Sequence, residues 1–381
     1  MMKVNFFAAL VATCIDAASL NQSEAFNYFA QLSDSKMPTC ATTSERARTP
    51  TKYFYEMQTG KHKFEDSAFP HGSQALFWAN MGEADGAMRA IEKTKGIEWN
   101  RASEKFPKAT LFGEEGVKIE EMDEAWIGNN WLVAAVSHIA EKPGRIEKLF
   151  LNNKNAQSPS GIYGVNIYVL GFPMTVMVDE YLPLIAGEDD SSSTIFSKVK
   201  DNGALWAPIL EKAFAKRYGN YEHIEKGLPS EAVRALTGAP YKEYLHKNMN
   251  VEELWQLVST KDKFDDFITV GTENADDAED GVGADKGYSY SVIDTHTLKK
   301  DNTRLIKIRN PWGNEGFRGT MTDKDPRWSD EVKKELGYTN GNDGAFWIDV
   351  NNYKMHFSET WISMKVEEWS AAKFLKINDE S

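Results

Sequence analysis

One stretch near the middle of the chain is apolar on nearly every side, and it constrains the fold more than any other segment. Residues 131–140 read Trp-Leu-Val-Ala-Ala-Val-Ser-His-Ile-Ala. A helix that is apolar all round has to be covered by protein on every face. The sequence therefore predicts a central buried helix over 131–140, around which the rest of the chain packs.

The segments that follow change from helical to extended patterns. Apolar residues recur at helical spacing over 205–214, which predicts a second, amphipathic helix. Further along, residues 288–293, 304–309 and 345–350 are rich in β-branched and aromatic side chains and are bounded by Gly, Asp and Asn. We therefore expect an α+β fold, with a helical first lobe and a strand-rich second lobe.

The composition excludes several classes of protein. A chain of 381 residues exceeds one typical domain, so two packed lobes plus an extension are expected. The formal charge of -13 argues against nucleic acid as a partner and against adhesion to anionic membranes. The two cysteines, Cys14 and Cys40, cannot form a disulfide framework, which fits a reducing compartment. No segment approaches the roughly 18 apolar residues that span a bilayer.

The N-terminus is open to two interpretations. Lys3 precedes an apolar run over 6–15, and Ala17-Ala18-Ser19 has the small residues of a signal-peptide cleavage site. The alternative is a short helix that packs on the core. The first interpretation places the protein in the secretory pathway if residues 1–19 are a signal peptide. The second corresponds to a cytoplasmic or cytoskeleton-associated protein.

Seven segments, in the right order and spacing, resemble the protease core of the calpain family. They are Phe64–Asp66, Trp99–Arg101, Gly128–Ala135, Leu205–Lys216, Gly287–Val292, Arg309–Gly313 and Asp343–Trp347. The resemblance implies a papain-like fold of two protease lobes. It divides the chain into an N-terminal extension (1–59), a first lobe (60–221), a second lobe (222–375) and a tail (376–381).

The resemblance also implies positions for a catalytic thiol, a histidine base, a residue that orients the histidine, and an oxyanion donor. The thiol position holds Asn130, whose amide has no proton to lose and little nucleophilicity. The histidine position holds Tyr288, whose ordinary pKa near 10 leaves it protonated at neutral pH. Asn310 matches the orienting residue. Glu124 stands where a glutamine faces the oxyanion, and an ionised carboxylate repels that charge.

Other roles for these residues are open. Asn is a preferred N-cap, so we expect the side chain of Asn129 or Asn130 to accept a bond from the first turn of the buried helix and to stabilise it. Ser137 and Ser289 are the alternative nucleophiles. Ser137 is expected to be buried two turns into the helix, and Ser289 to point away from the face that Tyr288 occupies.

The calpain resemblance further implies one calcium site in each lobe. In the first lobe Gly116 and Glu121 match ligands, but Ala204 replaces a carboxylate. In the second lobe Asp323 and Asp343 persist, whereas Gly316 and Ala345 replace the other carboxylates. Calcium requires six to eight oxygen ligands, so these vestigial positions predict weak or no binding, and no cofactor is expected.

The first interpretation of function is therefore a calpain-like pseudoprotease that serves as a structural or protein-binding subunit. The alternative is a calcium-dependent cysteine-type endopeptidase family member with residual or relocated hydrolase activity. A further alternative is competition with active calpains for substrates or inhibitors. A protein partner or larger assembly is expected in the first case, and the sequence does not identify it.

Overall fold

The computed structural model describes most of the chain after residue 52. The described residues are 53–60, 62–77, 87–119, 129–169, 171–187, 194–195, 197, 199, 203–272, 289–311, 327–337 and 344–364. The chain divides into two units, Met1–Lys52 and Tyr53–Ser381, and the fold below concerns the second. Several sequence predictions lie outside the described residues: the N-terminal segment through residue 52, the tail, and Glu121, Glu124, Tyr288, Gly316, Asp323 and Asp343.

The predicted central helix is confirmed as α7 (Asn130–Ala140), and all of its residues are buried. It packs against α9 (Pro229–Thr237), which begins with a proline at its first position and ends at Gly238 in a left-handed conformation. The second predicted helix is α8 (Trp206–Tyr218). Short helices precede α7 within the described residues: residues 53–58, α4 (Ser73–Leu76), α5 (Ala87–Thr94) and α6 (Ala102–Lys105). The short helix η3 (Glu147–Leu149) follows α7.

Helix α8 differs from its prediction in one respect. Its residues Trp206–Ala215 are all buried, including Glu211 and Lys212. The helix is therefore not amphipathic, contrary to the prediction. The two charged side chains are accommodated inside the protein because each has hydrogen-bonding partners on other elements. The sequence pattern could not reveal those partners.

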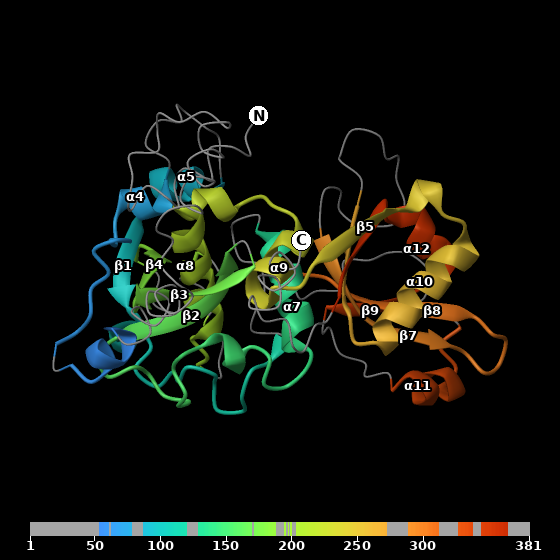
Figure 1. Cartoon of the computed structure of the whole chain (residues 1–381), viewed down its shortest axis with the longest axis horizontal. Helices are drawn as coiled ribbons and strands as arrows, with labels where there is room; N and C mark the ends of the chain where they lie inside the picture. The colour runs from blue at the N-terminus through green and yellow to red at the C-terminus, as the bar shows by residue number, and fades with distance from the viewer. Residues whose placement is uncertain are drawn as a thin grey trace, which may run out of the picture. The chain divides into compact units, whose positions relative to one another are not determined.

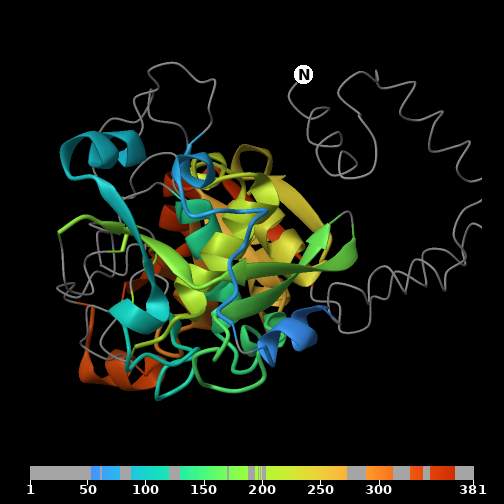
Figure 2. The same cartoon turned by 90° about the vertical axis from the view of Figure 1, so that its left-hand side faces the viewer.

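Two pairs of strands complete the first half. Strand β1 (Ile97–Arg101) pairs antiparallel with β4 (Tyr181–Ile185). Strands β2 (Ile162–Val169) and β3 (Phe172–Asp179) form an antiparallel hairpin that lies alongside α8 (Figure 2). The sequence analysis did not predict these strands.

A six-stranded antiparallel sheet dominates the second half, with strand order β5-β10-β6-β7-β8-β9 (Figure 1). Its strands are β5 (Tyr241–Leu245), β6 (Phe267–Gly271), β7 (Ser289–Thr297), β8 (Arg304–Arg309), β9 (Ala345–Asp349) and β10 (Glu359–Ser363). The predicted strands correspond to β7, β8 and β9. The α+β fold class is thereby confirmed.

Helices cover this sheet. Helix α10 (Val251–Lys263) begins with a capping box in which the side chains of Asn250 and Glu253 bond each other's backbone N–H. Residues of α10 and α12 (Val350–His356) form the second apolar core with one face of the sheet. The remaining elements of this half are η5 (Glu222–Ile224), η6 (His246–Asn248) and α11 (Asp330–Leu336).

Strand β6 faces both apolar cores, which explains how the two halves meet. Phe267 belongs to the core built around α7 and α8, whereas the next residue, Ile268, belongs to the core under α10 and α12. Successive residues of a strand point to opposite faces. Helix α7, which belongs to the first core, accordingly contacts β6 and β7 of the sheet (Figure 1).

The predicted boundary between lobes, at residues 221 and 222, stays a prediction. The packing adds one fact: Ala232, Val233 and Leu236 of α9 belong to the core around α7. Helix α9 therefore packs with elements that precede residue 222, and the sheet begins after it at β5. Among the helices of the described residues, none is both long and apolar enough to cross a bilayer.

Candidate functional site at the start of helix α7

Asn130 is the first residue of α7 and is 8% exposed. Its side chain forms no hydrogen bond with any residue in the described part of the chain. The first residue of the helix thus carries a carboxamide, at the position where the sequence resemblance predicts a catalytic thiol. Asn310 follows directly after β8, is buried, and its backbone N–H donates to the carbonyl of Gly344 at 2.8 Å. The backbone bond gives Asn310 a structural role at the end of β8.

The expected N-capping by an asparagine side chain is wrong. Asn129 is the N-cap residue, with φ -90° and ψ 29°, and its side chain makes no capping bond. Its carbonyl oxygen instead accepts from Leu132 and Val133, at 2.8 Å and 3.1 Å. The side-chain Nδ2 donates to Oε1 of Glu211 at 2.6 Å. A capping residue usually has an extended backbone, which Asn129 lacks, and its side chain is instead oriented so that Nδ2 reaches the carboxylate of Glu211.

Glu211 lies inside the protein, 1% exposed, on α8. Its second oxygen accepts from the backbone N–H of Ser197 at 2.7 Å. Burial raises the pKa of Glu211 to about 7, and the bonds from Ser197 and Asn129 oppose that rise only in part. No sequence pattern predicted a role for Glu211. The only available signal was a charged residue within the apolar pattern of 205–214.

The alternative serine nucleophiles lack a catalytic arrangement. Ser137 is buried within α7, as expected, and its Oγ has no hydrogen-bond partner. Ser289 begins β7 and is 7% exposed; its orientation relative to Tyr288 stays a prediction. Within the described residues no serine hydroxyl bonds a histidine. A thiol or hydroxyl nucleophile needs such a base.

Two buried histidines of the described residues, His138 and His246, have structural partners. Nε2 of His138 lies 3.3 Å from the carbonyl of Asp266, and burial lowers the pKa of His138 to about 4. Nε2 of His246 lies 2.7 Å from Oγ1 of Thr360, which also contacts the hydroxyl of Tyr353. All three side chains of that second group are buried, so they act within the core.

Trp131 is likewise a core residue. It is 2% exposed, its Nε1 donates to the carbonyl of Ile224 at 2.8 Å, and its ring packs edge-on against Phe214. The sequence also allows a groove for an extended peptide lined by Trp131, Tyr288 and Trp312, of which Tyr288 and Trp312 lie outside the described residues. The observed packing favours the simpler interpretation, in which Trp131 stabilises the core.

The calcium positions are only partly described. Gly116 has φ +82°, and a Cβ added to it would meet no described atom within 4 Å. Ala204 is buried and forms a bridge to Thr110. Among the described residues no group of three or more His, Cys, Asp or Glu side chains is arranged to hold a metal. Weak or absent calcium binding stays a prediction, because the remaining carboxylates lie outside those residues.

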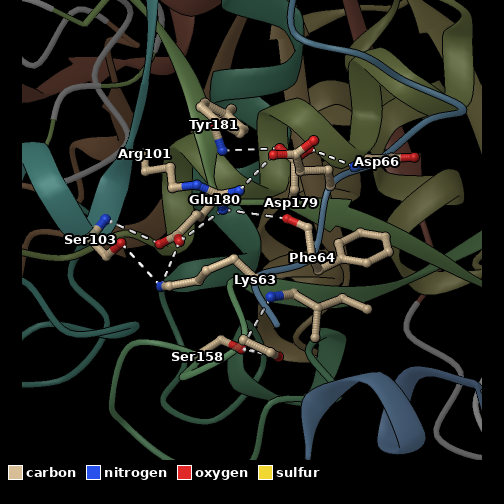
Figure 3. Close-up of polar contacts among 12 residues, drawn as sticks. Lys63, Phe64, Asp66, Arg101, Ser103, Ser158, Asp179, Glu180 and Tyr181 are labelled. Atoms are coloured by element: carbon tan, nitrogen blue, oxygen red, sulfur yellow. Dashed lines mark hydrogen bonds and ion pairs between the residues drawn. The ribbon is translucent and has the colours of Figure 1, made fainter. Parts of the chain in front are cut away.

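A buried network of charges joins two of the motif segments, Phe64–Asp66 and Trp99–Arg101 (Figure 3). Glu180, fully buried, accepts from Lys63 at 2.8 Å, from Arg101 at 3.2 Å and from the backbone N–H of Ser103 at 3.1 Å. Arg101 also donates to the carbonyl of Phe64 at 3.4 Å. The segment around Phe64 is thereby fixed to β1.

A second group of charges continues from this network to α8. Asp179 accepts from the backbone N–H of Asp66 at 2.8 Å and pairs with the buried ammonium of Lys212. Lys216 donates to Asp66 at 2.6 Å. Every carboxylate of the network faces a cation, as buried charges require. These contacts give the motif residues at 64–66 and 99–101 a structural role.

The two halves are also joined by charged and aromatic contacts at and just after the C-terminal end of α7. Arg145 pairs with Asp265, and its guanidinium lies 5.1 Å from the ring centroid of Phe267 on β6. The ring of His138 packs edge-on against the same phenylalanine, with centroids 5.6 Å apart. Asp265 has φ +60°, an uncommon conformation that aspartate tolerates better than most residues.

Fold and motif order define a protease core of the papain type, and comparison with known proteins identifies its family. The profile of the calpain family cysteine proteases matches residues 64–364. The chain belongs to the calpain family.

Curated relatives agree with this assignment. The chain is 28% identical to Calpain-12 of Mus musculus over 306 residues, which is 78% of this chain and 41% of that protein. It is 26% identical to Calpain clp-1 of Caenorhabditis elegans over 330 residues, 83% of this chain and 40% of that protein. It is 26% identical to Calpain-A of Drosophila melanogaster over 312 residues, which is 78% of this chain and 36% of that protein. The chain thus spans less than half the length of these relatives.

Proposed function

We propose that this protein uses the calpain fold to bind another protein and does not hydrolyse peptide bonds. The single observation that carries the proposal is the carboxamide of Asn130 at the first position of α7. A helix N-terminus activates a thiol because its dipole and free N–H groups stabilise the thiolate. An amide at that place has no charge to stabilise and no electron pair suited to attack.

Two sequence matches support the proposal. Tyr288, at the position of the histidine, stays protonated at neutral pH and cannot serve as a base. Glu124, at the position of the oxyanion donor, brings a negative charge toward a developing negative charge. Loss of a nucleophile or base alone typically lowers turnover by a factor of about 10^6, and further losses add little because the groups act as a unit.

Calcium has no required role in this proposal. The carboxylates lost at Ala204 and Ala345 leave too few negative oxygens to offset the dehydration of the ion. The partner is proposed to be a protein or a larger assembly, because the fold is retained while the groups for hydrolysis are replaced.

The direct test is incubation of the purified full chain with unfolded casein, with and without calcium. We expect no cleavage above that of buffer, and a binding measurement with the same casein reports on retained affinity. Matched variants Ser137→Ala and Ser289→Ala identify a relocated nucleophile. Turnover by the unaltered chain that disappears in one of them would establish the hydrolase alternative.

A restoration experiment tests the same proposal from the other side. The triple variant Asn130→Cys, Tyr288→His, Glu124→Gln regains the chemical groups of an active calpain. We expect casein turnover to stay at background even in calcium, because the calcium positions have also changed. The control is the melting temperature, which shows that the variant is folded. Robust calcium-dependent proteolysis by this variant would contradict the proposal that the calcium positions, as well as the catalytic groups, have lost their function.

A further inference from the structure

Glu211 is a buried carboxylate whose hydrogen-bond donors are neutral. Oε1 accepts from the side chain of Asn129 at 2.6 Å, and Oε2 accepts from the backbone of Ser197 at 2.7 Å. These bonds connect α8 to Asn129, the N-cap residue of α7, and to Ser197 in a third segment of the chain. The carboxylate is therefore a three-way junction beside Asn130.

The neighbouring cations are engaged elsewhere. Lys212, the next residue of α8, pairs with Asp179, and Lys216 pairs with Asp66. Among the described residues no lysine, arginine or histidine forms an ion pair with Glu211. The carboxylates of Glu180, Asp179 and Asp66 differ in this respect, because each of them pairs with a cation. Figure 3 shows the pair of Glu180 with Arg101.

The elements packed on α8 present few other titratable groups to Glu211. One such group is Tyr221, just before η5, whose pKa is raised well above 10 by burial and by the charges of Glu211 and Asp179. Strand β3 contributes Asp179, which Lys212 neutralises. On β2, the pKa of Tyr163 is raised by burial, and Glu180 adds to that rise. A negative Glu211 thus has no compensating positive charge from these elements.

We propose that Glu211 connects α8 to the start of α7 through a proton-dependent contact. The contact is stable when the carboxyl group is neutral and is weakened when it ionises. The physical reason is that an ionised group without a cation gains hydration whenever the junction opens, which favours the open state. The proposal goes beyond the proposed function and holds whether or not the protein cleaves peptides.

The sign of the pH dependence follows from linkage. The pKa of Glu211 is about 7 in the closed structure, against 4.5 when it is exposed to solvent. The closed state therefore binds more protons between these two values, and its stability falls as pH rises through that window. For one proton, the equilibrium constant for opening rises about tenfold per pH unit within the window and levels off above it.

Hydrogen exchange measures this opening directly. The amides of Leu132 and Val133 report it, because both donate to the carbonyl of Asn129. Their exchange rates, divided by those of an unstructured peptide, give the opening equilibrium from pH 5 to pH 8. We expect a rise of about tenfold per pH unit up to pH 7 in the full chain.

The variant Glu211→Gln removes the proton and keeps the shape. Its oxygen can accept from Ser197 and its nitrogen can donate to Asn129 after the asparagine amide turns, so both bonds are retained. We expect a flat pH profile in this variant. The matched control is Glu141→Gln, at the other end of α7, where burial raises the pKa of Glu141 to about 6. The profile at Leu132 and Val133 should be unchanged in that control.

A second variant keeps the test valid if Glu211→Gln does not fold. Asn129→Ala removes one donor that favours the ionised form, so the upper end of the window should move to higher pH. A role in packing alone would change the opening constant by the same factor at every pH. The proposal is wrong if Glu211→Gln keeps the pH profile of the full chain, or if Asn129→Ala leaves the window where it was.

Discussion

His138 is a histidine that folding keeps neutral. It is 4% exposed, and its pKa falls to about 4 because burial penalises the imidazolium and Arg145 repels it. The unfolded chain binds a proton near pH 6.5, whereas the folded chain does not until about pH 4. This residue therefore contributes stability that is present above pH 6.5 and is lost as pH falls toward 4.

The substitution His138→Gln tests that contribution. Glutamine can still donate to the carbonyl of Asp266 but does not titrate. Between pH 7 and pH 5, we expect the variant to lose about 2 kcal/mol less free energy of unfolding than the unaltered chain. Urea unfolding at the two pH values measures it. The comparison between variants is required because Glu211 changes stability in the opposite direction. Equal losses in both proteins would show that His138 is protonated when folded.

Gly161 is a glycine whose replacement conflicts with the charge network. It has φ +70°, and a Cβ would lie 2.6 Å from Oε1 of Glu180. For Gly161→Ala we expect a loss of about 2–4 kcal/mol, from the left-handed backbone and from displacement of a buried carboxylate. The control is Gly171→Ala, with φ +84° and no atom within 4 Å, which should cost about 1 kcal/mol. Similar losses at both sites in thermal unfolding would contradict the role assigned to the network.

At the scale of elements, the ion pair of Arg145 with Asp265 connects the turn after α7 to the turn before β6. Arg145 is also held over Phe267. A double-mutant cycle with Arg145→Leu and Asp265→Asn should give a coupling free energy of about 1–3 kcal/mol, because the pair is partly buried. Denaturant unfolding of the single and double variants measures the coupling. A value near zero would mean that the pair adds nothing beyond its separate side chains.

Helix α8 shows what an element's sequence can and cannot predict. The apolar residues at helical spacing correctly indicate a helix. An amphipathic helix would expose the charged pair Glu211 and Lys212, yet both are buried. Lys212 is accommodated by Asp179, 33 positions earlier in the chain, and Glu211 by Asn129. Such distant partners have no signal in the helix itself.

At the scale of the whole molecule, the sequence predicted the order of helices and strands but not the complete sheet. Strands β7, β8 and β9 have strong β-branched and aromatic patterns. The sheet also contains β5 and β10, and β10 lies between β5 and β6 although it comes last in the chain. Pairing between strands so far apart depends on tertiary packing, which a local pattern does not contain.

The candidate site was predicted to the same degree. The position of Asn130 at the start of a buried helix was correct, since that follows from local pattern and motif. The capping role expected for Asn129 was wrong, because its side chain is oriented toward Glu211 on α8, to which its Nδ2 donates. The prediction for Asn130 depended on residues nearby in the sequence, whereas the prediction for Asn129 depended on residues that are close only in the folded structure.

The charge network around Glu180 has a consequence for synthesis on the ribosome. Glu180 is 117 positions from Lys63 and 79 from Arg101, while Lys216 lies 150 positions from Asp66. A chain emerges from its N-terminus, so the early charges stay hydrated until partners made much later leave the exit tunnel. We therefore expect the first half to complete its folding only after α8 has been translated.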